Sequence, residues 1–127
     1  MAEKIIGLSG DKGEPEVEIV IGFAQFGKYR FSLSTPNGEE FRAIFEGDNA
    51  DSRPDKFVVP WPVEELDNRV LRWKVIIAAF ETGPGELYSV IVRVRQDGAN
   101  VPDSPFKASG PLDGVKVLED EARFRVL

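Results

Sequence analysis

The sequence predicts an all-β fold, an antiparallel two-sheet sandwich of eight or nine short strands. Apolar and polar residues alternate over several short segments, which is the period of a half-buried strand. Turn-forming glycine, proline, asparagine and aspartate separate most of these segments. A single open sheet of 127 residues would leave one apolar face in water, so two packed layers are expected. With 42% apolar residues the chain fills one core, and residues 1–127 are predicted to be one domain.

The first half of the chain contains the clearest predicted hairpin. Residues 28–35 alternate strictly between apolar and polar side chains, and residues 41–45 resume the alternation. The intervening Pro36-Asn37-Gly38 combines a fixed φ with two residues that tolerate turn conformations. Upstream, residues 17–23 alternate in the same way, and residues 4–8 are expected to form a short first strand.

The middle of the chain is punctuated and polar. Residues 47–54 predict a loop, and the short apolar run 57–59 is ended by Pro60, which favours the edge of a sheet. In residues 62–66 a proline precedes two glutamates, a pattern typical of the first turn of a helix. We expect a single helical turn there and no longer helix.

Two strands of the second half are predicted to be central. Residues 70–80 have one continuous apolar face, and from Ile76 onward apolar residues also replace cations on the other face. The second half of this strand is therefore expected to be covered on both sides. Residues 88–95 alternate in a similar way between predicted turns at 83–85 and 97–98.

The end of the chain predicts weaker elements. A short strand is expected around residues 115–118, followed by an acidic turn at 119–121. The last predicted strand covers residues 122–126, with alternate apolar side chains directed inward.

Composition excludes several classes of function. The chain has neither cysteine nor histidine, so it has no disulfide, no thiolate chemistry and no imidazole base or metal ligand. A net charge of −6 disfavours binding to nucleic acid or to an anionic membrane, because both are polyanions. The opening residues lack the apolar run of a signal peptide, and no stretch is long enough to span a bilayer. We expect a cytoplasmic protein.

Paired cations on the polar sides of predicted strands are the first candidate site. Neighbouring strands of this kind would give one sheet face a basic stripe, able to contact a carboxylate-rich or phosphate-bearing partner. The competing interpretation is ordinary cross-strand pairing with the glutamates of adjacent strands, each pair contributing about 0.2–1 kcal/mol. The four pairs are Lys28 and Arg30, Arg72 and Lys74, Arg93 and Arg95, and Arg123 and Arg125.

Trp61 and the acidic segment 48–55 are the second candidate. Trp61 lies between two prolines and is expected in a loop, where a displayed indole can bind sugars or peptides. The alternative is that Trp61 folds back to plug one end of the sandwich. The segment 48–55 could supply oxygen ligands for calcium, but its spacing matches no calcium-loop signature, so no metal site is predicted. The glycine-rich segment 7–13 lacks the order of a phosphate-binding loop.

Residues 88–106 contain a recognisable motif, which reads Tyr88-x-Val90-x-Val92, then Gly98-x-x-Val101-Pro102-x-Ser104-Pro105-Phe106. This segment resembles the last hairpin of filamin-type immunoglobulin-like repeats. The resemblance implies that the sandwich is immunoglobulin-like and that it binds partners by pairing a peptide strand to a sheet edge. Gly27-x-Tyr29 leading to Thr35-Pro36 is similar to a mid-domain strand of the same family.

We therefore predict a non-enzymatic interaction or structural module that binds a protein partner through an edge strand or a basic sheet face. No catalytic residue and no cofactor are predicted, although an enzyme with two carboxylates facing each other across a cleft remains an alternative. A further alternative is a carbohydrate- or small-ligand-binding sandwich that uses Trp61 and the 48–55 loop. The candidate partner-binding residues are Arg72, Lys74, Arg93, Arg95 and Trp61.

Overall fold

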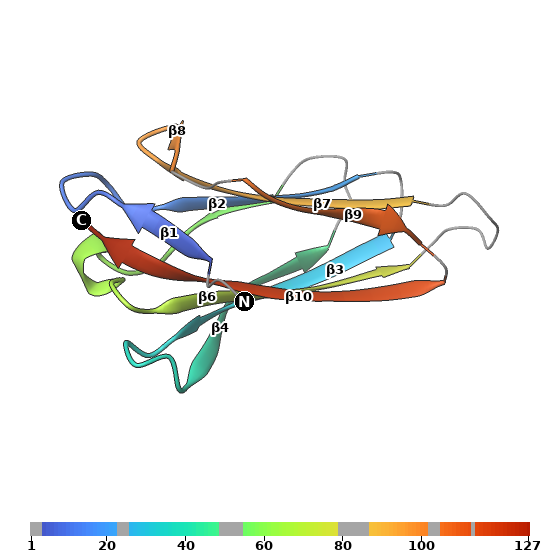
Figure 1. The fold of residues 1–127 in the computed structure, drawn as a ribbon, viewed down its shortest axis with the longest axis horizontal. Helices are drawn as coiled ribbons and strands as arrows, with labels where there is room; N and C mark the ends of the chain where they lie inside the picture. Colours follow the sequence, from blue (N-terminus) through green and yellow to red (C-terminus); the bar gives the residue numbers. More distant parts are fainter. Residues whose placement is uncertain (1–3, 23–25, 49–54, 79–86, 102–104, 113) are drawn as a thin grey trace.

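The computed structural model describes residues 4–22, 26–48, 55–78, 87–101, 105–112 and 114–127, which form ten strands and one short 3-10 turn (Figure 1). No helix in these residues is long and apolar enough to cross a lipid bilayer. The elements are β1 (Ile5–Leu8), β2 (Glu16–Gly22), β3 (Phe26–Ser34), β4 (Phe41–Asp48), β5 (Asp55–Val58), η1 (Val63–Glu65), β6 (Val70–Ala78), β7 (Leu87–Gln96), β8 (Ala99–Asn100), β9 (Phe106–Pro111) and β10 (Val115–Val126).

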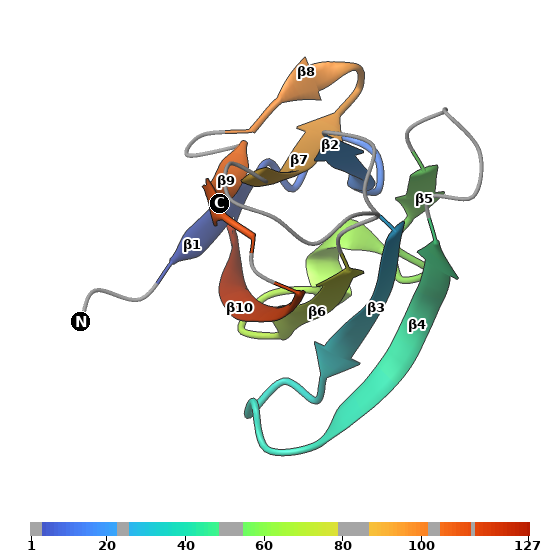
Figure 2. The same cartoon turned by 90° about the vertical axis from the view of Figure 1, so that its right-hand side faces the viewer.

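The strands form two sheets of five. Sheet A has the order β1-β10-β6-β3-β4, and sheet B has the order β5-β2-β7-β8, with β9 also pairing with β7. Figure 2 shows the two sheets as separate layers, with β4 at the far edge of sheet A from β1 and β10. The two-sheet, all-β prediction is confirmed.

One strand pair departs from the predicted, mostly antiparallel pairing. β1 runs parallel to β10, with Ile5 opposite Arg123 and Leu8 opposite Val126. Two such strands need a crossover rather than a tight turn. Here the chain leaves β1 for sheet B and returns to sheet A twice, at β3 and at β6, before it forms β10.

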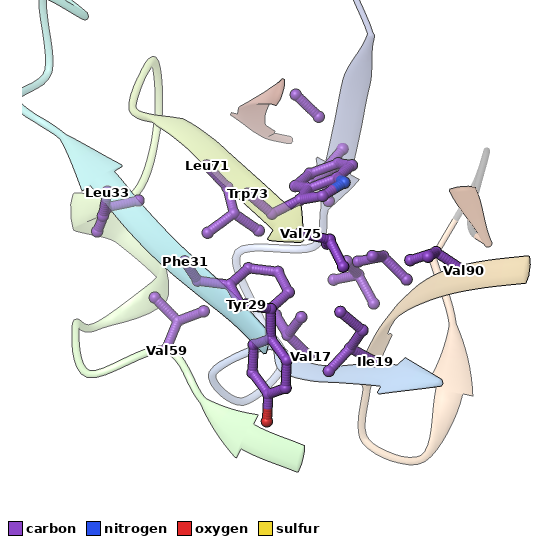
Figure 3. Close-up of a cluster of buried hydrophobic side chains, with 14 of the residues drawn as sticks. Val17, Ile19, Tyr29, Phe31, Leu33, Val59, Leu71, Trp73, Val75 and Val90 are labelled. Carbon is purple, nitrogen blue, oxygen red and sulfur yellow. The ribbon is translucent and has the colours of Figure 1, made fainter. Parts of the chain in front are cut away.

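The core lies between the inner faces of the two sheets. Alternate side chains of β6, including Leu71, Trp73 and Val75, belong to the same buried cluster as Val17 and Ile19 of β2 (Figure 3). Each fully buried aliphatic or aromatic side chain contributes about 1.5–3 kcal/mol relative to exposure. The strict alternation in these strands is therefore what assigns one face of each sheet to the core.

Aromatic packing closes the side of the sandwich where β4 and β5 lie. The rings of Phe45 in β4 and Phe57 in β5 stack with centroids 4.5 Å apart. Phe31 lies 5.0 Å from Phe57, and Tyr29 lies 6.0 Å from Phe45. These contacts join sheet A to sheet B along this side.

Most of the predicted elements are confirmed. The hairpin is β3 and β4, joined by a turn in which Gly38 has φ +77°. Both predicted central strands are central, since β6 lies between β10 and β3, and β7 lies between β2 and β9. β5 is an edge strand, and the predicted helical turn is η1. The predicted turn at 83–85 lies outside the described residues.

The C-terminal part of the prediction is wrong. Residues 119–121 form no turn but lie inside β10, a continuous strand of 12 residues. Their side chains find partners across the sheet, because Glu119 lies opposite Lys74 and Glu121 lies opposite Arg72. The strands β8 and β9 were also not predicted, which raises the number of strands to ten in the described residues.

The predicted double burial of the second half of β6 is also wrong for Ile76. Its side chain is 42% exposed, because the outer face of sheet A at this point is not covered by another layer of described residues.

Candidate functional site

Two neighbouring strands of sheet A bring their paired cations together on its outer face. β3 carries Lys28 and Arg30 and β6 carries Arg72 and Lys74, while the alternate residues of both strands fill the core. The register places Arg30 directly opposite Lys74. Two side chains of the same charge in this position are destabilising in an antiparallel pair.

An open groove of about 500 Å³ lies over these cations. Lys28, Arg30 and Lys74 line it, together with Ile76 from β6. We call this feature the cationic groove. Glu46 and Asp48 of β4 line one side of the groove, and the Glu46 carboxylate forms an ion pair with Arg30, with Oε1 and Nε 2.8 Å apart. Lys28 and Lys74 make no ion pair with any described residue.

The floor of the cationic groove depends on a glycine. Gly47 in β4 lies opposite Tyr29 in β3, and a Cβ at Gly47 would overlap the hydroxyl end of the Tyr29 ring. The Tyr29 hydroxyl donates a hydrogen bond to the Asp55 carboxylate at the start of β5. Tyr29 therefore connects β3 to β5 of sheet B, and position 47 of β4 has room beside the Tyr29 ring for glycine only.

Carboxylates flank the cations on both sides. β10 supplies Glu119 and Glu121 on one flank, and β4 supplies Glu46 and Asp48 on the other. Arg72 is held by this frame, because its Nη2 lies 3.4 Å from Glu121 and its guanidinium lies 3.7 Å from the centre of the Phe41 ring. The cations thus form the centre of the face and the acids form its margins.

The candidate residues Arg93 and Arg95 lie on the other sheet. They project from the outer face of sheet B and surround Glu18 of β2, which is only 6% exposed. Glu18 oxygens lie 2.9 Å from Arg93, 3.7 Å from Arg95 and 3.8 Å from Lys56 of β5. We call this arrangement the Glu18 hub. The predicted candidates therefore do not form one stripe, and the cross-strand pairing interpretation describes sheet B.

Sequence reasoning missed the Glu18 hub and the apolar neighbours of the cationic groove. Four exposed apolar side chains lie at one end of the outer face of sheet A, and we call them the apolar ladder. The register puts Val117 opposite Ile76, and Val115 and Phe26 on either side of Ala78. A signal existed in the sequence, since these residues interrupt the polar side of three strands. The exposed fractions are 61% for Phe26, 42% for Ile76, 64% for Val115 and 52% for Val117.

Trp61 folds back instead of standing free. It packs against the core, and the Arg69 guanidinium lies 5.5 Å from the centre of its ring. It lines a cleft of about 240 Å³ with Phe41 and Arg42, at the start of β4, whereas Asp48 lies at the other end of that strand. The structure thus does not bring Trp61 together with Asp48, and residues 49–54 lie outside the described residues.

Main-chain N–H groups of the glycine-rich segment are used internally. Ser9 N–H donates to the buried Gln96 side chain, Gly10 N–H donates to the Leu127 carbonyl, and Gly13 N–H donates to Asp97. The Gln96 amide donates in return to the carbonyls of Ser9 and Gly13. This segment is a structural connection that Gln96 holds.

Comparison with protein-family models, with curated proteins and with solved structures finds no match to this chain. Within the described part of the chain, no three histidine, cysteine, aspartate or glutamate side chains gather to hold a metal ion. On the outer face of sheet A the described surface places arginine and lysine donors beside exposed apolar side chains.

Proposed function

We propose that this protein is a non-enzymatic interaction module that binds an acidic, partly apolar segment of a partner protein on the outer face of sheet A. The observation that carries the proposal is the direct opposition of Arg30 and Lys74 in the two neighbouring strands. This arrangement costs stability in the free protein. A carboxylate bound between the two cations relieves the repulsion and accepts charge-assisted hydrogen bonds.

The apolar ladder supports a partner that is not purely acidic. Ile76 belongs both to the ladder and to the lining of the cationic groove, so the two features are continuous. Burial of exposed valine, isoleucine and phenylalanine contributes about 25 cal/mol per Å² of apolar surface. The groove then selects carboxylates, and the ladder supplies the apolar contact that screening by salt does not remove.

The remaining parts of the expected function stay predictions. An immunoglobulin-like order of connections and a resemblance to filamin-type repeats are compatible with two β sheets, and both support a role in protein recognition. A cytoplasmic location fits the composition of the chain. Sugar binding by Trp61 gains no support from its position against the core.

A direct binding assay tests the proposal. The probe is a fluorescein-labelled peptide of alternating glutamate and valine, followed by fluorescence anisotropy at low and at physiological salt. The double variant Lys28→Glu/Lys74→Glu should lose at least tenfold in affinity, because it replaces attraction with repulsion. The variant Lys12→Glu/Lys107→Glu makes the same change of charge at exposed lysines outside the groove and is the matched control.

Equal losses in the two variants would show that only net charge matters, and this result would sink the proposal. Unchanged affinity in Lys28→Glu/Lys74→Glu would also move the site away from the cationic groove. Affinity of the unmodified protein should fall with salt but not vanish, because the apolar ladder is expected to retain part of the binding energy.

A further inference from the structure

Most of β10 borders an open sheet edge. β1 pairs with β10 only from Arg123 to Val126, at one end of the long strand (Figure 1). The remainder, from Val115 to Ala122, has β6 on one side. Among the described residues no strand lies on its other side. An exposed edge of this kind is a template for pairing with another chain.

The hydrogen bonds at the end of β10 show which main-chain groups face the open side. Arg123 N–H donates to the Lys4 carbonyl and Leu127 N–H donates to the Leu8 carbonyl, whereas Phe124 N–H donates to the Arg69 carbonyl on the opposite side. Since these directions alternate along a strand, the odd-numbered residues of β10 direct N–H and C=O toward the open edge.

Part of this edge is already closed by a side chain. The Asp120 carboxylate accepts a hydrogen bond of 2.9 Å from Glu121 N–H and an ion pair from Lys4. The edge groups of Val115, Val117 and Glu119 have no partner among the described residues. At these three positions the main-chain N–H and C=O groups are open to pairing with another strand.

We propose that this edge pairs antiparallel with the same edge of a second copy of the chain, about a two-fold axis at Val117. In this register Val117 lies opposite the second copy's Val117, and Val115 lies opposite its Glu119. Each of the three open residues then both donates and accepts a main-chain hydrogen bond. The interface is self-complementary, as a two-fold axis requires.

Charge and apolar exposure select a second copy in this orientation. The edge is apolar at its start and acidic at its end, so antiparallel pairing keeps Glu119 away from the second copy's Glu119, whereas parallel pairing puts them side by side. Lys116 lies diagonal to the second copy's Asp120, which is an attractive arrangement. Val117 is 52% exposed, and in this register it packs against Val117 of the second copy at the two-fold axis.

The pairing also covers an apolar cleft beneath the edge. A cleft of about 90 Å³ opens between β9 and β10, lined by Trp73, Phe106 and Leu118 among others. It is smaller than the roughly 150 Å³ cavity that holds benzene. The dimer continues sheet A across both copies with both outer faces on one side, so two cationic grooves would face the same partner surface and gain avidity.

Disulfide trapping tests this pairing directly, because the chain contains no cysteine. Val117→Cys places two thiols at the axis, where directly opposed residues of a hydrogen-bonded antiparallel pair have Cα atoms about 5.5 Å apart, within the range that a disulfide spans. Val58→Cys is the control, since Val58 is 56% exposed and also lies in an edge strand. In a glutathione redox buffer, Val117→Cys should form a covalent dimer at least tenfold faster. Equal rates would overturn the proposal.

A second pair of variants tests the main-chain part of the interface. Val115→Pro removes an edge N–H at the first residue of β10, a position that tolerates proline, while Val115→Thr keeps the N–H. In the Val117→Cys background, proline should slow trapping at least tenfold and threonine should not. Circular dichroism and the thermal midpoint confirm that each variant is folded. Trapping as fast with proline as with threonine would contradict edge pairing.

Discussion

The two outer faces of the sandwich carry similar cations in different settings. On sheet B, Arg93, Arg95 and Lys56 converge on one carboxylate, Glu18, which is almost fully buried. On sheet A, Arg30 and Lys74 face each other, and their carboxylates lie outside them on the flanking strands. The first arrangement pairs its cations with one buried carboxylate, whereas in the second Arg30 pairs with the exposed Glu46 and Lys74 has no ion pair among the described residues.

The difference shows that the residues on the neighbouring strands, and not the spacing of the two cations in the sequence, decide whether the cations are paired within the protein. Arg93-x-Arg95 and Arg72-x-Lys74 have the same spacing in the sequence. Arg93 and Arg95 lie opposite Glu18 and Glu16 of β2. Arg72 and Lys74 lie between Glu121 and Glu119 of β10 on one side and Ser32 and Arg30 of β3 on the other. Variants that remove or reverse single charges should therefore have unequal effects on the two faces.

The largest effect is expected for Glu18→Gln. The substitution leaves three cations around a neutral amide, and removing one partner of a buried ion pair is strongly destabilising. Because the cations themselves are partly exposed, we expect a loss of about 2 kcal/mol in the free energy of unfolding. Urea denaturation measures it. Glu46→Gln removes the exposed Arg30 pair of sheet A and should cost less than about 0.5 kcal/mol.

Added salt gives an internal control for this comparison. Salt screens the repulsion among the three cations that Glu18→Gln leaves behind, so the loss of stability should shrink as salt rises. A loss that is equal at all salt concentrations would assign the effect to packing or hydrogen bonding and not to charge.

The Glu18 hub could not be predicted from the sequence, although most of the fold could. Alternation and turn residues are local signals, so they place the β3–β4 hairpin and the central strands β6 and β7 correctly. Glu18 also alternates as a surface residue would, and its burial arises only because Arg93 and Lys56 approach from both neighbouring strands.

The acidic run at 119–121 misled the prediction for the same reason. Three consecutive acidic residues indicate a turn when their partners on the neighbouring strand are not known. In β10 the first and last of them lie opposite Lys74 and Arg72, so the neighbouring strand stabilises an extended conformation. Side-chain pairs across strands depend on the register, and the register is not a local property of the sequence. The cations of the groove were likewise predicted on the polar sides of their strands, but the sequence does not show that β3 and β6 are neighbours.

An intermediate effect is expected for Gly47→Ala, which acts on the floor of the cationic groove. The added methyl group overlaps Tyr29, whose ring is held by Asp55 and by Phe45. Overpacking of this kind costs about 1–2 kcal/mol. Thermal or urea unfolding measures the loss. Gly7→Ala is the matched control in β1, because a Cβ there has no atom within 4 Å, and it should leave stability unchanged or slightly raised.

Because Gly47 lies in the groove and outside the Glu18 hub, Gly47→Ala should also weaken the acidic peptide. Unchanged stability in Gly47→Ala would show that Tyr29 moves aside freely, and the groove would then have no fixed floor.

The smallest effect on stability is expected for Arg30→Glu. Arg30 lies between Lys74 on one side and Glu46 on the other, so reversal of its charge exchanges one repulsion and one attraction for the opposite set. The change in the free energy of unfolding should stay within about 0.5 kcal/mol. The same reversal at Arg93 puts a second carboxylate beside Glu18 and should cost clearly more. Arg30→Glu should nevertheless abolish binding of the acidic peptide, which separates the charge that recognises a partner from the charge that holds the fold. Similar losses of stability for the two arginines would remove the distinction between the two faces.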